Sequence, residues 1–188
     1  DRASPMWKTM THLNPKGNKL FQLVKDVRSL MNGSPVIARS YNHTTGKFSP
    51  NQIRASKDVI LVEGLHTLYP KQLIEELDVR IFIEMDESLK LYFRVNRDVN
   101  ERGQSKKQVL DAIEKRKSDS QKYIKPQALR SDVIFSLVPN NPELLEGSNS
   151  LSPNLKLNVS IKNGIYYDEL VKVLIGICGL QVNISSID

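Results

Sequence analysis

The stretch Asp58-Val-Ile-Leu-Val-Glu-Gly-Leu-His66 decides how this chain is expected to fold. Its apolar residues follow one another without alternating polar ones, which is typical of a strand covered on both faces in a parallel sheet. Two similar runs occur further along the chain, at residues 79–85 and 131–138. Helical patterns stand between these runs, at residues 70–77, 87–99 and 105–123. Strands that alternate with helices predict an α/β fold with a mostly parallel sheet flanked by helices.

An acidic residue, Glu63, ends the first apolar run. Ligands of open α/β sheets bind beyond the carboxyl ends of the strands. A carboxylate at this place is positioned to hold Mg²⁺ against the phosphates of a nucleotide. The alternative is that Glu63 caps the following helix and that Gly64 supplies a backbone conformation with positive φ. This motif supports the two interpretations equally.

Residues 94–103 read Arg-Val-Asn-Arg-Asp-Val-Asn-Glu-Arg-Gly and form the second motif. On a helix, Arg94, Arg97 and Glu101 share one face. Guanidinium groups placed in this way bind phosphates through paired hydrogen bonds and offset the charge on a transferring phosphoryl group. The alternative is a surface helix whose charges simply pair with one another.

The dipeptide Arg102-Gly103 breaks the helical pattern and predicts a hinge. The strongly charged helix expected at residues 105–123 follows directly, so it is a candidate for a lid that closes over a ligand. Arg116 is the residue of this helix that we expect to face the phosphates, although a charged helix face is more often only solvated.

The turn Tyr41-Asn-His-Thr-Thr-Gly46 follows a short extended segment and forms a third candidate site. In the functional interpretation, Tyr41 and His43 bind the hydroxyl groups of a polar substrate. An ordinary turn stabilised by an asparagine side chain explains the Asn, Thr and Gly residues equally well.

The chain of 188 residues carries 27 Lys and Arg against 21 Asp and Glu, which gives a net charge of +6. The basic residues are interleaved with acidic ones, and aromatic residues make up only 6% of the sequence. A nucleic-acid-binding surface with bases stacked on aromatic side chains is therefore not expected. The pattern instead favours a site for phosphorylated small molecules.

No apolar run approaches the roughly 20 residues of a membrane-spanning helix, so no membrane partner is expected. Cys178 is the one cysteine in the sequence. A single cysteine excludes a disulfide within the chain and fits a reducing cytoplasm, which predicts a cytoplasmic location.

Taken in order, five motifs resemble the phosphoribulokinase/uridine kinase family of P-loop kinases, across roughly residues 10–138. They are Thr11-His-Leu-Asn-Pro15, Tyr41-Asn-His-Thr-Thr-Gly46, Asp58–His66, Arg97-Asp-x-x-Glu-Arg-Gly103, and Tyr123-Ile-Lys-Pro-Gln127 before Ser131-Asp-Val-Ile134. The Tyr-Asn-His, Glu-Gly-Leu-His and Pro-Gln details are more similar to phosphoribulokinase than to uridine kinase.

This resemblance implies transfer of the γ-phosphoryl group of ATP to a sugar hydroxyl, with Mg²⁺. It assigns catalytic roles to Arg97, Arg102 and Glu63, with Glu63 on the metal side of the nucleotide. It further places Tyr41, His43, Arg94, Arg97 and Arg102 at the acceptor or its phosphate, and Arg116 on the lid at the nucleotide.

The family's loop Gly-x-x-Gly-x-Gly-Lys-Ser/Thr, which surrounds phosphates with backbone N–H groups and a lysine, does not occur in this sequence. We therefore expect that the first strand and the phosphate loop are missing from it, which is about 40 residues for one strand–loop–helix unit. The acid that activates the acceptor is expected in the same missing part.

We expect one domain, in which residues 1–138 form the acceptor-binding and lid parts of a kinase core. Residues 139–154 then form a surface loop, and residues 155–188 add a strand and a helix to the same domain. The expected function is an ATP- and Mg²⁺-dependent kinase for a sugar phosphate such as ribulose 5-phosphate, or for a nucleoside. The alternative is a non-catalytic relic that binds sugar phosphates for regulation. The resemblance also implies pairing into a homodimer.

Overall fold

The computed structural model describes residues 5, 10–42, 45, 47–145 and 153–179. Contacts within the chain separate two compact units. The first unit comprises Asp1–Arg80 and Lys90–Arg130, and the second comprises Ile81–Leu89 and Ser131–Asp188. No helix within the described ranges is long and apolar enough to cross a membrane.

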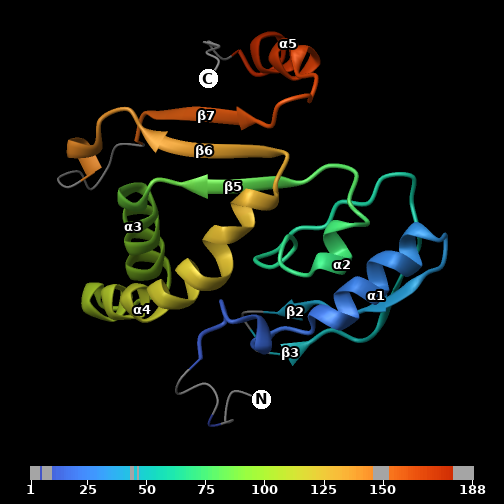
Figure 1. Ribbon diagram of the computed structural model, residues 1–188. Coiled ribbons are helices and arrows are strands. Elements are labelled where there is room, and N and C mark those ends of the chain that lie inside the picture. Colours follow the sequence, from blue (N-terminus) through green and yellow to red (C-terminus); the bar gives the residue numbers. More distant parts are fainter. Residues whose placement is uncertain (1–4, 6–9, 43–44, 46, 146–152, 180–188) are drawn as a thin grey trace. The chain divides into compact units, whose positions relative to one another are not determined.

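The first unit has a small core between α1 (Leu20–Met31) and α2 (Lys71–Ile74), shown in Figure 1. Apolar residues of α1 recur at helical spacing, so Val24 and Val27 lie on the same face and pack against the fully buried Leu73. An ion pair of 2.6 Å between Arg28 Nε and Glu76 Oε1 links α1 to the segment just after α2 at the surface. The apolar spacing of residues 19–31 is typical of such a helix.

Two small antiparallel hairpin sheets follow α1 in the first unit. Strand β1 (Val36–Ala38) pairs with β4 (Gln52–Arg54), and β2 (Tyr41–Asn42) pairs with β3 (Lys47–Phe48). These strands are two or three residues long, and the sequence predicted only the first of them as an extended segment.

The segment Asp58–Glu63 does not form the strand that its apolar sequence predicts. Val59 and Leu61 are 85% and 86% exposed, whereas Val62 is partly buried against the core of α1 and α2. Within the described part of the chain, the backbone of this segment makes no hydrogen bond to a neighbouring strand. A strand needs such a neighbour, so the apolar run remains as an extended segment with one face exposed.

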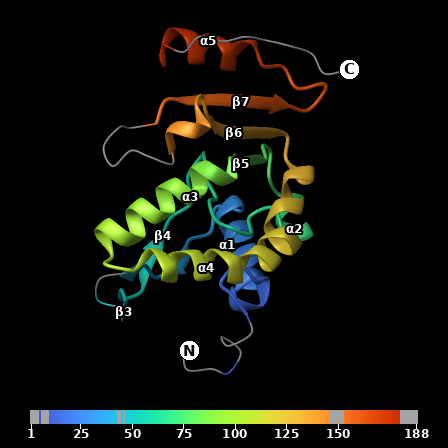
Figure 2. The same ribbon diagram turned by 90° about the vertical axis from the view of Figure 1, so that its left-hand side faces the viewer.

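Helix α3 (Glu87–Asn96) continues into a π-helical turn, Arg97–Glu101, and the chain then reverses before α4 (Lys106–Asp119). Figure 2 shows this reversal between the two helices. Gly103 lies at the reversal with φ of 65°, a left-handed conformation that favours glycine. The predicted helices and the predicted break between them are confirmed. After α4, a π-helical turn (Ser120–Ile124) and a 3₁₀ segment (Lys125–Arg130) complete the first unit.

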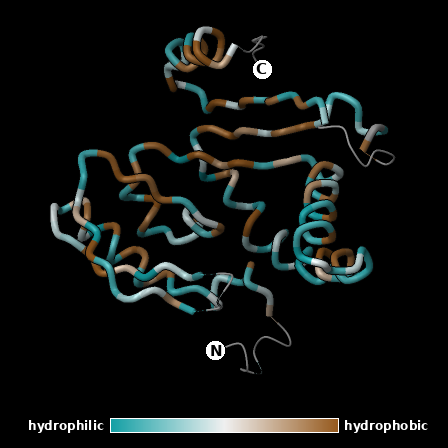
Figure 3. The backbone as a smooth tube through the Cα atoms, turned by 180° about the vertical axis from the view of Figure 1, so that it is seen from behind, coloured by the Kyte–Doolittle hydropathy of each residue, from teal (hydrophilic) through white to brown (hydrophobic). Residues whose placement is uncertain are grey.

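The second unit contains a three-stranded sheet in the order β5 (Ile81–Met85), β6 (Val133–Pro139), β7 (Leu155–Ile161), followed by α5 (Asp168–Gly176). β5 and β6 run parallel, while β6 and β7 run antiparallel. Hydrophobic residues run along β5 and β6, whereas hydrophobic and hydrophilic residues mix along β7 (Figure 3). The α/β class is confirmed, and the described sheet of this unit is mixed.

Candidate functional site

One carboxylate, Asp98, organises the arginines of the second motif. Asp98 is only 5% exposed, and its Oδ1 accepts hydrogen bonds from Arg97 Nε at 2.9 Å and Arg102 Nη1 at 3.1 Å. Arg94 Nε lies 3.6 Å from Asp98 Oδ2. The hydrogen bond from Arg97 holds the pKa of Asp98 below its ordinary value, and the charges of the three arginines act in the same direction against the effect of burial.

The three arginines carry more positive charge than Asp98 can neutralise. The side chains of Arg97 and Arg102 are about half-exposed, so their remaining N–H donors face solvent. Glu101, which the sequence placed on the same helix face, is exposed and makes no ion pair with these arginines within the described residues. The Arg94–Arg97–Arg102 group, called the arginine cluster below, is therefore suited to bind an anion such as a phosphate.

His12 lies near Arg94 of the arginine cluster, and His66 lies near His12. His66 is 4% exposed, and neither ring nitrogen has a hydrogen-bond partner among the described residues. Burial lowers the pKa of both His66 and His12, and the charges of Arg94 and His66 lower that of His12 further. Arg94 Nε is also buried without a hydrogen bond, and burial lowers the pKa of Arg94. Buried nitrogens of this kind mark a polar region that is not saturated by the protein itself.

Glu63 is exposed and forms neither an ion pair nor a hydrogen bond with another described residue. Gly64 follows it with φ of 155°, as the alternative interpretation of this motif expected, but Glu63 does not cap the following helix, because α2 begins after Pro70. Mg²⁺ is commonly held by one or two carboxylates together with substrate phosphates and water. The unpaired carboxylate of Glu63 fits such a role, and no group of three metal-ligating side chains occurs within the described ranges.

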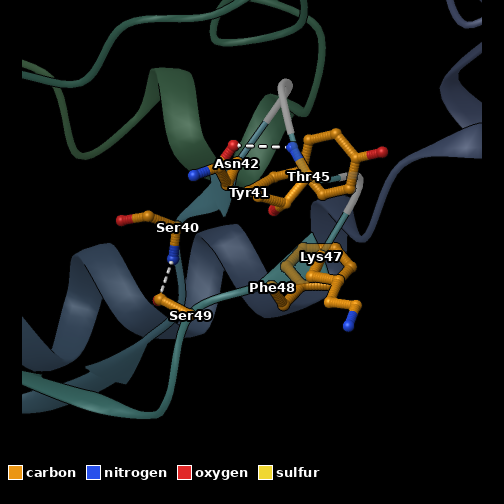
Figure 4. Close-up of a pocket in the computed structure, with 7 residues that line it drawn as sticks. All are labelled: Ser40, Tyr41, Asn42, Thr45, Lys47, Phe48 and Ser49. Atoms are coloured by element: carbon orange, nitrogen blue, oxygen red, sulfur yellow. Dashed lines mark hydrogen bonds between the residues drawn. The ribbon is translucent and has the colours of Figure 1, made fainter.

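Tyr41 lines a hollow of about 470 Å³ in the hairpin of β2 and β3 (Figure 4). Its ring meets that of Phe48 edge to face, with centroids 5.1 Å apart. The hydroxyl of Ser49 accepts the backbone N–H of Ser40 at 2.9 Å and closes the base of the hairpin. His43, the second residue predicted for this site, lies outside the described residues.

Arg116 lies on α4 and is partly buried, and no hydrogen bond or ion pair within the described residues joins it to the arginine cluster. The carboxyl end of its helix is held at Asp119, whose Oδ2 accepts the backbone N–H of Thr11 at 3.2 Å and its hydroxyl at 2.7 Å. The lid role of Arg116 stays a prediction.

The structure thus brings together Arg94, Arg97 and Arg102 among the predicted site residues, whereas Glu63 makes no hydrogen bond or ion pair with them within the described residues. The sequence reasoning missed Asp98 as the centre of this group. The four-residue spacing from Asp98 back to Arg94 and forward to Arg102 is the signal that identifies it.

Comparisons with known proteins agree with these observations. A sequence model of the Phosphoribulokinase / Uridine kinase family matches residues 1–142. Phosphoribulokinase from Synechocystis sp. is 29% identical over 169 residues, 90% of this chain and 50% of that protein. Chloroplastic phosphoribulokinase from Spinacia oleracea is 32% identical over 139 residues, 74% of this chain and 35% of that protein. Uridine kinase from Staphylococcus haemolyticus is 32% identical over 115 residues, 60% of this chain and 56% of that protein.

Among solved structures, a phosphoribulokinase from Rhodobacter spheroides matches with a TM-score of 0.64 and 22% identity. The match covers 89% of this chain and 65% of that one, and shows that the fold is shared. The chain spans about half the length of the curated relatives it matches, or less. Because the family's sequence model covers most of its residues, the chain belongs to the phosphoribulokinase/uridine kinase family.

Proposed function

We propose that the full-length protein is a small-molecule kinase that transfers the γ-phosphoryl group of ATP to a hydroxyl of a sugar phosphate such as ribulose 5-phosphate. The observation that carries this proposal is the arginine cluster around Asp98, which leaves half-exposed guanidinium groups for phosphate binding. Family membership supports the reaction class.

In this proposal, Arg97 and Arg102 bind the acceptor phosphate or the transferring phosphoryl group, and Asp98 holds both side chains in place. Tyr41 and His43 bind the acceptor hydroxyls. Mg²⁺ supplies charge neutralisation at the nucleotide phosphates when bound, and the carboxylate of Glu63 contributes to holding it.

A sugar phosphate fits the arginine cluster better than a nucleoside does. A nucleoside acceptor carries no phosphate, so it leaves most of the positive charge of the cluster without a partner. A phosphorylated acceptor brings a dianion in addition to the transferring group, which matches three arginines held by a single carboxylate.

Residues 1–188 contain no phosphate loop, so they do not by themselves fit the phosphates of ATP. The proposal therefore places the nucleotide-binding loop and the acid that activates the acceptor in residues of the full-length protein outside this sequence. We derive no step of the reaction from these groups.

Single-turnover transfer from labelled ATP tests the proposal, with full-length protein, Mg²⁺, and either ribulose 5-phosphate or uridine as acceptor. We expect label on the sugar phosphate. Arg102→Met should lower kcat/KM by about 10²- to 10³-fold, because it removes donors to the phosphate. Lys106→Met, an exposed change nearby on α4, should alter it by less than about twofold. Absence of transfer to every acceptor refutes the kinase function.

A second function is regulatory binding of sugar phosphates without catalysis, for which the half-exposed guanidinium groups of the arginine cluster suffice. Calorimetry on full-length protein separates the two functions. Binding of the sugar phosphate without binding of ATP supports the regulatory function, whereas binding of both supports the kinase.

A further inference from the structure

The buried side chain of Gln127 joins two segments of the first unit that are about sixty residues apart. Gln127 is 4% exposed. Its Oε1 accepts the backbone N–H of Leu68 at 3.1 Å, and its Nε2 donates to the carbonyl oxygens of Leu65 at 2.9 Å and Tyr123 at 2.7 Å. One amide therefore satisfies three backbone groups, two of them in the turn that follows Glu63.

The two segments are those that the proposed function uses. The turn Leu65–Leu68 begins two residues after Glu63 and carries His66, which lies near His12. Tyr123 belongs to the turn that continues α4. Gln127 thus ties the segment that carries the metal-side carboxylate to the end of the predicted lid helix.

Further contacts hold the same turn. Arg130 Nη1 donates to the carbonyl oxygens of Leu68 and Tyr69, at 3.2 Å and 2.8 Å. The ring of Tyr69 meets those of His66 and Tyr123 edge to face, with centroids 5.9 Å and 6.1 Å apart. Among the side chains of the described residues, only that of Gln127 is hydrogen-bonded to the backbone of both Leu65 and Leu68.

An uncharged amide suits this position because it both donates and accepts. A carboxylate of the same shape would turn an oxygen toward the carbonyls of Leu65 and Tyr123 and lose both donated bonds. An apolar side chain of similar length would leave one buried and two partly buried backbone groups without this partner.

We infer that Gln127 is a positioning residue of the reaction, which holds the Glu63–Leu68 segment in register with the end of α4. The inference rests on the proposed function, in which the carboxylate of Glu63 contributes to Mg²⁺ binding. In this role Gln127 contacts neither the acceptor nor the nucleotide and acts through the backbone of the turn Leu65–Leu68.

The test compares Gln127→Met and Gln127→Glu with wild-type full-length enzyme, and uses Gln121→Met, an exposed change in the preceding turn, as the matched control. We expect the half-saturating Mg²⁺ concentration to rise about 10-fold and kcat to fall about 10- to 100-fold in both Gln127 variants. KM for the sugar phosphate should stay within about twofold, because the arginine cluster is untouched. The control should match the wild type.

Amide hydrogen exchange adds a readout that needs no activity. Leu68 N–H should exchange faster in Gln127→Met, which removes its acceptor, and stay protected in Gln127→Glu, which keeps it. The second variant also serves if the first fails to fold.

A purely structural role predicts lower thermal stability with unchanged Mg²⁺ dependence. That result in an active enzyme overturns the inference while the proposed function stands. A wild-type enzyme that transfers no phosphoryl group overturns both.

Discussion

Asp98 is the residue on which the geometry of the arginine cluster depends. Three arginines pair with its carboxylate: Arg97 is its neighbour in sequence, and Arg94 and Arg102 lie four residues before and after it. The carboxylate is almost completely buried, so its charge is offset by these guanidinium groups and not by water.

Asp98→Asn should lower the free energy of unfolding by about 1.5–3 kcal/mol, because it weakens charged hydrogen bonds and brings unneutralised arginines together. Urea denaturation measures this difference. Asp111→Asn, an exposed change on α4, removes the same charge and should cost less than about 0.5 kcal/mol. Equal effects of the two substitutions would show that Asp98 is not an organising residue.

His66 should make stability depend on pH. Burial lowers its pKa, so below about pH 6.5 the unfolded chain binds more protons than the native protein does. The free energy of unfolding therefore falls as the pH falls from about 7 through the folded pKa. His66→Phe keeps a ring against Tyr69 and removes this titration, so the variant should lose less stability between pH 7 and 5.

Thermal unfolding at half-unit pH intervals measures how steeply stability changes with pH in the wild type and in His66→Phe. The charge of His66 also lowers the pKa of His12, so the difference between the wild type and the variant contains the effect of His66 on both histidines. Identical slopes would contradict the prediction.

At the scale of elements, α4 is fixed at both ends by side chains. At its amino end, the Ser105 hydroxyl accepts the backbone N–H of Gln108 at 3.2 Å, and the Gln108 side chain accepts that of Ser105 at 2.8 Å. At its carboxyl end, Asp119 is bonded to Thr11. A lid motion of α4 about the Gly103 turn would therefore have to break the hydrogen bonds between Asp119 and Thr11.

Ser105→Ala should destabilise the first turn of α4 by about 1 kcal/mol, because it removes the reciprocal cap. Amide exchange in the first turn measures the loss, and Ser118→Ala in the exposed last turn of the same helix is the control. Protection that survives Ser105→Ala would mean that the cap is not what holds this turn.

Local patterns predicted these elements well where the interactions that form them are local. The apolar spacing of α1, the cap of α4 and the alternation of β7 are all visible in sequence windows of a few residues. The π-helical turn at residues 97–101 is not, because α-helical spacing placed Glu101 beside Arg94 and Arg97. The role of Gln127 as a link between two segments is visible only in the structure, because its partners Leu65 and Leu68 are distant in sequence.

On the scale of the whole molecule, apolar segments of the chain differ sharply in whether their backbones are hydrogen-bonded to neighbouring strands. β6 has a hydrogen-bonded strand on each side, while the segment Asp58–Glu63 has none within the described residues. The apolar sequences of the two are similar, so the difference comes from their neighbours and could not be predicted from either segment alone.

Amides of β6 should therefore exchange at least about a thousand-fold more slowly than those of residues 59–62 in the 188-residue chain. Hydrogen exchange followed by NMR or mass spectrometry measures both in one sample. Slow exchange at residues 59–62 would show that another strand pairs with them, which contradicts the prediction for this chain.

The exposed segment Asp58–Glu63 also has a consequence for the behaviour of the chain at high concentration. Unpaired backbone groups beside Val59 and Leu61 form a template on which strands of separate molecules can stack into β-rich aggregates. Asp58 and Glu63 bracket this template, and their charges repel one another when copies approach in register. Because salt screens that repulsion, aggregation should accelerate as ionic strength rises, and the chain should stay dispersed best in dilute buffer.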